Sequence, residues 1–548
     1  MIAGKRGAVI FLPAYLLSVV VILIYPFRMF QGFSQIDPLG IIPDPYVFSI
    51  IVSLMLLTYI WLMYTFGTSK WSTIIVLTTS VIFGLITYKM EPLGVDHEYG
   101  LTLTDASYIG VYHHFSQPLA PNVGYLAYPG ISLLTYAMSE ALNLSLIQSA
   151  SALQVALYPL VGVSVYLLAI RLVEKPFLAS MSTVLIFAFS LIGGNMTLFF
   201  PLTLGLTFFV LATTLIKERL GNNALIAFGV LYAGMIITHF YDPLHMVFIL
   251  GILMIPILGI KSKNFLRPFV LSMVVFISYL AYQAQNYFNS LVPGIFITFT
   301  HLLSYHSFGY ISQVAIANTV GIPLWATLIR YFDIVITSIF GTLIAVWLLV
   351  SALSSRSRHS NYIYVVSLMC LGIIVFGIVA FLASLGSGGG FDLLVGPQYV
   401  PVTSVPILIF FLSKYRRLMI VFAVCLAVLA APSLFALTYH QISIISVYPD
   451  EITLSNYFLS HQTGNLTLAT DPKTGGIIQS ANPAYKLIYI QEPLASFPYY
   501  PQYYNIIYPA YSFYQLHLYG FAPSLQAILY HDMVYSNGYS FILPPQFS

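Results

Sequence analysis

Long apolar segments alternate with short polar ones from the start of the chain to about residue 438. Each apolar segment approaches the roughly 17–25 residues that a helix needs to cross the hydrocarbon core of a bilayer. We therefore predict thirteen membrane-spanning helices, near 7–27, 47–66, 72–89, 147–172, 177–193, 197–216, 223–239, 243–260, 266–286, 328–353, 362–385, 397–413 and 418–438. The first follows Lys5 and Arg6 and lacks a small-residue cleavage site, which favours a retained helix over a signal peptide.

Most of the lysines and arginines fall in alternate loops between these segments. If Lys5 and Arg6 are cytoplasmic, the same side holds Lys70, Arg171, Lys175, Lys217, Arg219, Lys261, Lys263, Arg267, Arg356, Arg358, Lys414, Arg416 and Arg417. Positively charged loops are retained on the cytoplasmic side of a membrane. The pattern predicts a multi-pass plasma-membrane protein with a cytoplasmic N-terminus and an extracytoplasmic C-terminus.

The predicted topology divides the chain into two parts. Residues 1–440 form an all-α transmembrane domain, which includes exterior loops at 90–146 and 287–327. Residues 441–548 form a small exterior α/β domain.

The pattern within this tail predicts a helix at 450–461 and strands at 465–470, 485–490 and 537–543. Its Tyr-rich stretch at 497–511 would stack on sugar rings or form a protein-binding surface.

Composition agrees with a membrane protein, since 59% of the residues are hydrophobic, 7% are charged and the mean hydropathy is +0.88. The formal net charge of +3 is too small and too scattered to indicate nucleic-acid binding. Cys370 and Cys425 both lie inside apolar segments, so neither a disulfide framework nor a thiolate metal site is indicated.

An acidic cluster follows the third predicted span, in "VDHEYGLTLTDASYIG" at 95–110. In an extended segment Asp96 and Glu98 would project to one face and His97 to the other. Two carboxylates on one face suit a divalent cation such as Mg²⁺ or Mn²⁺, or a general base with an orienting partner. Asp105 would lie close by on the substrate side. The simpler alternative is a solvated exterior loop, and spacing alone favours it.

The order of motifs after this cluster resembles a known superfamily. "DASYIGVYHHF" at 105–115 is amphipathic, and "GYLAYPGISLLTYAMSEAL" at 124–142 is an aromatic turn that leads into an apolar helix. This order resembles the GT-C superfamily of polyprenyl-phosphate-dependent glycosyltransferases. In its protein O-mannosyltransferases and aminoarabinose transferases, the first large exterior loop carries an Asp-Glu pair, a tyrosine and a Pro-rich turn.

The sequence departs from that pattern at two points. His97 stands between the two acids, which leaves open which of them would be the base, and "YPG" stands where those families more often have two prolines. The plan of the chain is also that of the oligosaccharyltransferase catalytic subunit, but the tail lacks a motif of the "WWDYG" type. The tail looks like the exterior domains of archaeal and bacterial GT-C-like proteins.

This resemblance implies transfer of a sugar from a polyprenyl-phosphate carrier to a protein or glycan acceptor on the exterior face, with Asp96 or Glu98 as base or metal ligand. Two cations are candidates to bind the donor phosphate. Arg330 lies near the exterior start of its span and would clamp a phosphate or pair with Asp333. Lys89 would bind the phosphate or extend to the membrane interface.

A second group of polar residues, in "THFYDPLHM" at 238–246, lies at the exterior ends of the seventh and eighth spans. His239, Asp242 and His245 are suitable ligand types for a metal, and ionisable groups at this depth are usually functional. Alternatively, Asp242 caps a helix that begins at Pro243 while His239 bonds a neighbouring loop. We favour a substrate-facing role for His239 over zinc binding, with Asp242 beside it.

Other chemistry is less well supported by the sequence. Nearly all of the 12 histidines map to loops or helix ends, so no haem is expected. Asn465, in "NLT", fits a glycosylation acceptor in the exterior domain.

Three function classes remain to be distinguished. A glycosyltransferase requires a cavity that joins residues 96–98 to 239–242. A non-enzymatic scaffold subunit of a cell-envelope assembly requires no such cavity and uses the tail to bind a partner. A transporter requires paired carboxylates at the bilayer midplane, and the predicted spans contain almost none.

Overall fold

The fold is taken from a computed structural model of the chain. The structure describes residues 2–24, 43–66, 71–90, 97–113, 128–193, 200–216, 221–255, 265–285, 339, 341–347, 349–350, 362–387, 395–412, 415–437, 449–461, 467–470, 478, 486–489, 504–507, 535–536 and 541–543.

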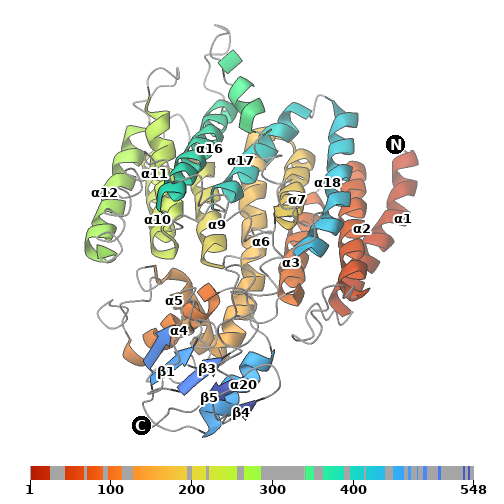
Figure 1. The fold of residues 1–548 in the computed structure, drawn as a ribbon. Helices are drawn as coiled ribbons and strands as arrows, with labels where there is room; N and C mark the ends of the chain where they lie inside the picture. The colour runs from red at the N-terminus through yellow and green to blue at the C-terminus, as the bar shows by residue number, and fades with distance from the viewer. Residues whose placement is uncertain are drawn as a thin grey trace.

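The described chain is predominantly helical. A helix lies at every predicted span except 328–353, most of which is outside the described residues. These helices are α1 (Ile2–Ile24), α2 (Pro43–Phe66), α3 (Trp71–Met90), α6 (Leu146–Val173), α7 (Pro176–Gly193), α9 (Phe200–Leu215), α10 (Asn222–Thr238), α11 (Tyr241–Leu253), α12 (Leu266–Tyr282), α16 (Tyr362–Ser387), α17 (Val395–Leu412) and α18 (Arg416–Leu437). They pack side by side as a bundle (Figure 1).

Length and composition single out one of these helices. Among the described residues, α6 is the one helix that is long and apolar enough to cross a membrane, and ten other apolar helical stretches are 10–17 residues long. A capping box defines the start of α6, since Gln148 N–H donates to Ser145 Oγ while the Ser145 N–H donates to Gln148 Oε1.

Small residues allow α3 and α6 to approach closely within the bundle. A Cβ at Gly162 would lie 2.0 Å from Ser80 Oγ, and one at Gly84 would lie 2.6 Å from the carbonyl oxygen of Val155. Because neither position has room for a side chain, the two backbones pack at short range, as is common between apolar helices.

Two shorter helices, α4 (His97–Tyr112) and α5 (Gly130–Leu142), lie at one end of the bundle (Figure 1). The prediction of an extended segment around the acidic cluster is therefore wrong from His97 onward. Leu103, Ala106 and Ile109 are buried at a spacing of three residues, which is the spacing of one helix face. The α4 helix packs this face against the rest of the protein, and that burial favours a helix over an open strand.

The same end of the molecule carries a five-stranded sheet with helix α20 (Pro449–His461) beside it (Figure 1). The strands are β1 (Thr467–Thr470), β2 (Lys486–Tyr489), β3 (Tyr504–Ile507), β4 (Tyr535–Ser536) and β5 (Phe541–Leu543), in the order β2-β1-β3-β5-β4. β1 pairs in parallel with β2 and β3, whereas β5 is antiparallel to β3 and β4.

Elements of this sheet coincide with predicted ones. α20, β1, β2 and β5 lie where the pattern predicts a helix and strands. β3 was not predicted, because it lies within the Tyr-rich stretch at 497–511, whose aromatic side chains we interpreted as a binding surface.

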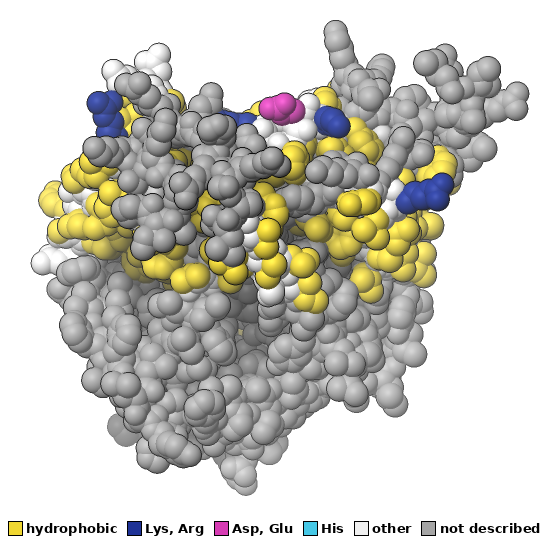
Figure 2. All heavy atoms as spheres, turned by 90° about the horizontal axis from the view of Figure 1, so that it is seen from above, with side chains coloured by type: hydrophobic (Ala, Val, Ile, Leu, Met, Phe, Trp, Pro, Cys, Tyr) yellow, Lys and Arg dark blue, Asp and Glu magenta, His cyan; other side chains and the backbone are white. Residues whose placement is uncertain are grey.

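The opposite end of the bundle carries the described basic residues. Arg171, Lys175, Arg267 and Arg417 lie at the ends of α6, α7, α12 and α18. Figure 2 views the molecule from above Figure 1 and shows Lys and Arg side chains at this end, with hydrophobic side chains around them. These four basic residues and the layer of α4, α5 and the sheet therefore lie at opposite ends.

Candidate functional site

The structure describes only part of the predicted site. Asp96, Arg330 and Asn465 lie outside the described residues. His97 and Glu98 form the first turn of α4, and Lys89 lies in the last turn of α3, but their side chains are not described. Asp105, His239, Asp242 and His245 are described in full.

Asp105 is buried on the packing face of α4, with 1% of its surface exposed. Within the described part of the chain, neither carboxyl oxygen has a hydrogen-bond partner, and the same is true of Thr102 Oγ1, one turn earlier. Burial raises the pKa of Asp105 well above its usual range, since the charged form loses its hydration. The neutral carboxylic acid is the form that this environment favours.

The start of α5 packs directly against the end of α10. A Cβ at Gly130 would lie 2.8 Å from the Ile237 carbonyl oxygen and 3.0 Å from Thr238 Oγ1. Just before α5, the ring of Tyr128 lies edge-on to Phe240, with 6.1 Å between the centroids. The segment after the acidic cluster is thus in contact with the "THFYDP" segment.

The junction between α10 and α11 turns at two residues. His239 follows α10 with extended backbone angles (φ −158°, ψ 147°), and Phe240 is the N-cap of α11 without a side-chain hydrogen bond. The alternative that Asp242 caps a helix beginning at Pro243 is wrong, because α11 begins at Tyr241 and Asp242 lies inside its first turn. The carboxylate points into the bundle instead.

Partners from three other positions surround the Asp242 side chain, which is 0% exposed. Tyr399, on α17, donates its hydroxyl hydrogen to Oδ1 of Asp242. Nδ1 of His239 lies 3.3 Å from Oδ2, and that oxygen rests against α9 at Gly205, where a Cβ would lie 2.0 Å away. A buried carboxylate is tolerated when it is paired in this way.

His239 and His245 differ in accessibility. The His239 side chain keeps 11% of its surface exposed. His245 is buried, its Nδ1 lies 2.8 Å from the Tyr241 carbonyl oxygen, and its ring stacks on Tyr399 at 4.4 Å between centroids. These contacts make His245 a packing partner of Tyr399.

The metal interpretation of this segment gains no support. Among the described residues no group of three His, Cys, Asp or Glu side chains is arranged to hold a metal ion. Around Asp242, Nδ1 of His239 lies close to one carboxylate oxygen, and Tyr399 orients the carboxylate through the other. Such a pair can bind a polar substrate group or transfer a proton.

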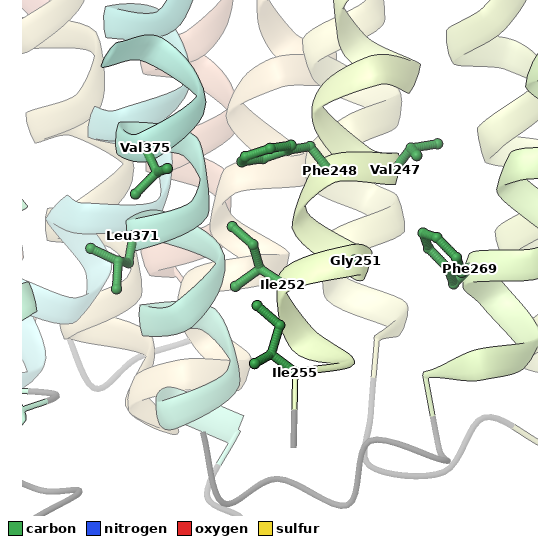
Figure 3. Close-up of a pocket in the computed structure, with 8 residues that line it drawn as sticks. All are labelled: Val247, Phe248, Gly251, Ile252, Ile255, Phe269, Leu371 and Val375. Atoms are coloured by element: carbon green, nitrogen blue, oxygen red, sulfur yellow. The ribbon is translucent and has the colours of Figure 1, made fainter. Parts of the chain in front are cut away.

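An apolar groove lies further along α11, toward its C-terminal end. Its volume is about 640 Å³, and side chains of α11, α12 and α16 line it, among them Phe248, Ile252 and Leu371 (Figure 3). Because its lining carries no ionisable side chain, this groove contains no group for acid–base or phosphate chemistry.

Two residues of the Asp242 environment were missed by sequence reasoning. Tyr399 is 157 residues away in an apolar helix, and Gly205 is a single glycine in another. A weak signal existed, since "GPQYVP" at 396–401 places a tyrosine between two prolines within a span.

No family model matches the chain, and no curated protein matches it significantly. The functional conclusion therefore depends on the site itself.

Proposed function

We propose that the protein is a GT-C-like integral membrane glycosyltransferase of the plasma membrane. It transfers a sugar from a polyprenyl-phosphate-linked donor to a protein or glycan acceptor on the exterior face. Asp96 or Glu98 acts as general base or as ligand of a divalent cation, Arg330 or Lys89 binds the donor phosphate, and the Tyr-rich tail faces the acceptor or a partner protein.

The observation that carries this proposal is the contact between two distant polar segments. The enzyme hypothesis requires a cavity that joins residues 96–98 to 239–242, and the segment that follows residues 96–98 lies beside residues 239–242. Gly130 packs against Thr238, and Tyr128 packs against Phe240, so α5 and the α10–α11 junction share one end of the bundle. The scaffold hypothesis predicts no cavity between residues 96–98 and 239–242.

The surface of the bundle supports a lipid environment for the helices. Large apolar side chains are exposed on the outer helices, for example Leu17, Ile226, Val230, Val274 and Leu349. Large exposed apolar surfaces mark membrane or protein contacts. With the basic residues at one end, the positive-inside rule orients α4, α5 and the sheet toward the exterior.

The test is turnover of a panel of radiolabelled polyprenyl-phosphate-linked sugars by the full chain in lipid nanodiscs. We expect transfer or donor hydrolysis by the parent, and a loss of at least 100-fold in Asp96→Asn or Glu98→Gln. Glu140→Gln is the matched control, because Glu140 is an exposed acid on α5 at the same end of the molecule. Absence of turnover with every donor, together with a stable partner bound to the tail, would favour the scaffold.

A further inference from the structure

The His239–Asp242 pair has the composition and proximity of a proton-transfer dyad, with Nδ1 3.3 Å from Oδ2. A carboxylate that binds one ring nitrogen of a histidine fixes its orientation and tautomer, which leaves the other nitrogen for a substrate. Here Asp242 faces Nδ1 at 3.3 Å, and the partly exposed side chain is that of His239 rather than Asp242. Nδ1 of His239 is enclosed beside Asp242, so Nε2 is the ring nitrogen that is left for a substrate.

The carboxylate is held from two further sides. The Tyr399 hydroxyl donates to Oδ1, and Gly205 leaves the space that Oδ2 occupies. The Tyr399 ring is itself held by the His245 ring, which stacks on it. The centroid of the His245 ring lies 4.2 Å from that of Phe376. Asp242 is therefore restrained by α9, by α17 and by its own helix, and a restrained carboxylate in turn restrains the imidazole.

We propose that His239 is the proton acceptor of the reaction, with Asp242, Tyr399 and Gly205 as positioning residues. This inference rests on the proposed function. It assigns the general base, a role for which the sequence did not decide between Asp96 and Glu98. Nε2 of His239 takes the proton of the acceptor hydroxyl as that oxygen attacks the anomeric carbon. The bond from this carbon to the phosphate oxygen breaks, and the phosphate leaves with the electron pair.

The assignment divides the chemistry between the two segments. General acid–base catalysis by a positioned histidine contributes about 10²- to 10⁴-fold in rate. Asp96 and Glu98 would then be the ligands of a divalent cation, which would supply charge neutralisation for the leaving phosphate. The proton on His239 passes afterwards to the departed phosphate or to water, which restores the neutral ring.

The deciding experiment separates kcat from KM in His239→Gln, with the donor that the parent protein uses. We expect kcat to fall at least 100-fold and KM to change less than threefold, because glutamine can bond Asp242 but cannot accept the proton. Tyr399→Phe should lower kcat about tenfold. Tyr232→Phe is the matched control, since this buried tyrosine bonds the Pro243 carbonyl oxygen rather than Asp242, and it should stay within twofold of the parent.

A spectroscopic readout keeps the inference separate from the proposed function. In ¹⁵N-histidine NMR spectra of the full chain in nanodiscs, the His239 signals should change in Asp242→Asn and Tyr399→Phe but not in Tyr232→Phe. An active parent whose His239→Gln variant keeps more than a third of kcat, or changes only KM, overturns the inference and leaves the proposed function standing. A parent that is inactive with every donor overturns the function, while the NMR signals still report whether the dyad exists.

Discussion

Asp105 and Asp242 are both buried carboxyl groups at the same end of the molecule, but their surroundings differ. Asp242 has a tyrosine donor, a histidine partner and a glycine that makes room for it. Asp105 has no hydrogen-bond partner among the described residues. Burial alone therefore does not identify a reactive carboxylate. The partners decide whether a buried carboxyl group is oriented toward another reactive side chain.

The largest effect on stability should come from a substitution that fills the space beside Asp242, the better-partnered of the two carboxyl groups. Gly205→Ala places a methyl group 2.0 Å from Oδ2, and both groups belong to packed helices that cannot easily move. We expect a loss of about 3 kcal/mol in the free energy of unfolding, at the upper end of the cost of overpacking. Thermal unfolding in nanodiscs measures this loss.

Gly229→Ala serves as its control. The added methyl group there meets only Leu271 Cδ2, at 3.3 Å, and that side chain can shift. Equal stability of the two variants would show that the helices relax around Asp242, and that Gly205 is not required there.

Removal of the Tyr399 hydroxyl should have a smaller effect on stability. Hydrogen bonds to charged groups contribute about 1.5–3 kcal/mol, so we expect Tyr399→Phe to lower the free energy of unfolding by about 2 kcal/mol. The Tyr232→Phe variant should lose about 1 kcal/mol, because its partner is an uncharged carbonyl group. An indistinguishable loss in both variants would mean that Asp242 is not charged.

The smallest effect is expected at Asp105, and it depends on pH. Its pKa in the folded protein is raised well above the ordinary value of 3.8 by burial, so the folded state binds more protons than the unfolded state between these two values. Stability should fall as pH rises through this window. Asp105→Asn should remove the fall and stabilise the protein by about 1 kcal/mol at the upper end of the window.

The measurement is the free energy of unfolding of the parent and of Asp105→Asn, from pH 4 upward. An identical pH dependence would show that Asp105 gains a partner that stabilises its charge, such as a bound cation. Asp105 would then resemble Asp242, and the contrast between the two carboxyl groups would disappear.

The sequence predictions succeeded where the structure depends on neighbouring residues, and they failed where it depends on contacts between distant segments. Helix positions agree closely with the apolar segments because each depends on a continuous local pattern. The acidic cluster was misjudged because its conformation depends on the face that Leu103, Ala106 and Ile109 bury against other elements. The pairing of His239 with Asp242 was within reach, since the two residues are three apart at one turn of the chain.

The sequence by itself determined where the helices form, which loops are basic and which short segments are rich in ionisable groups. These properties depend on neighbouring residues and on the period of a helix. Only the tertiary structure decided that Tyr399 and Gly205 meet Asp242, that α5 packs against the α10–α11 junction, and that Asp105 is buried with no hydrogen-bond partner among the described residues. Such contacts join residues that are far apart in the chain, and packing of whole helices selects them.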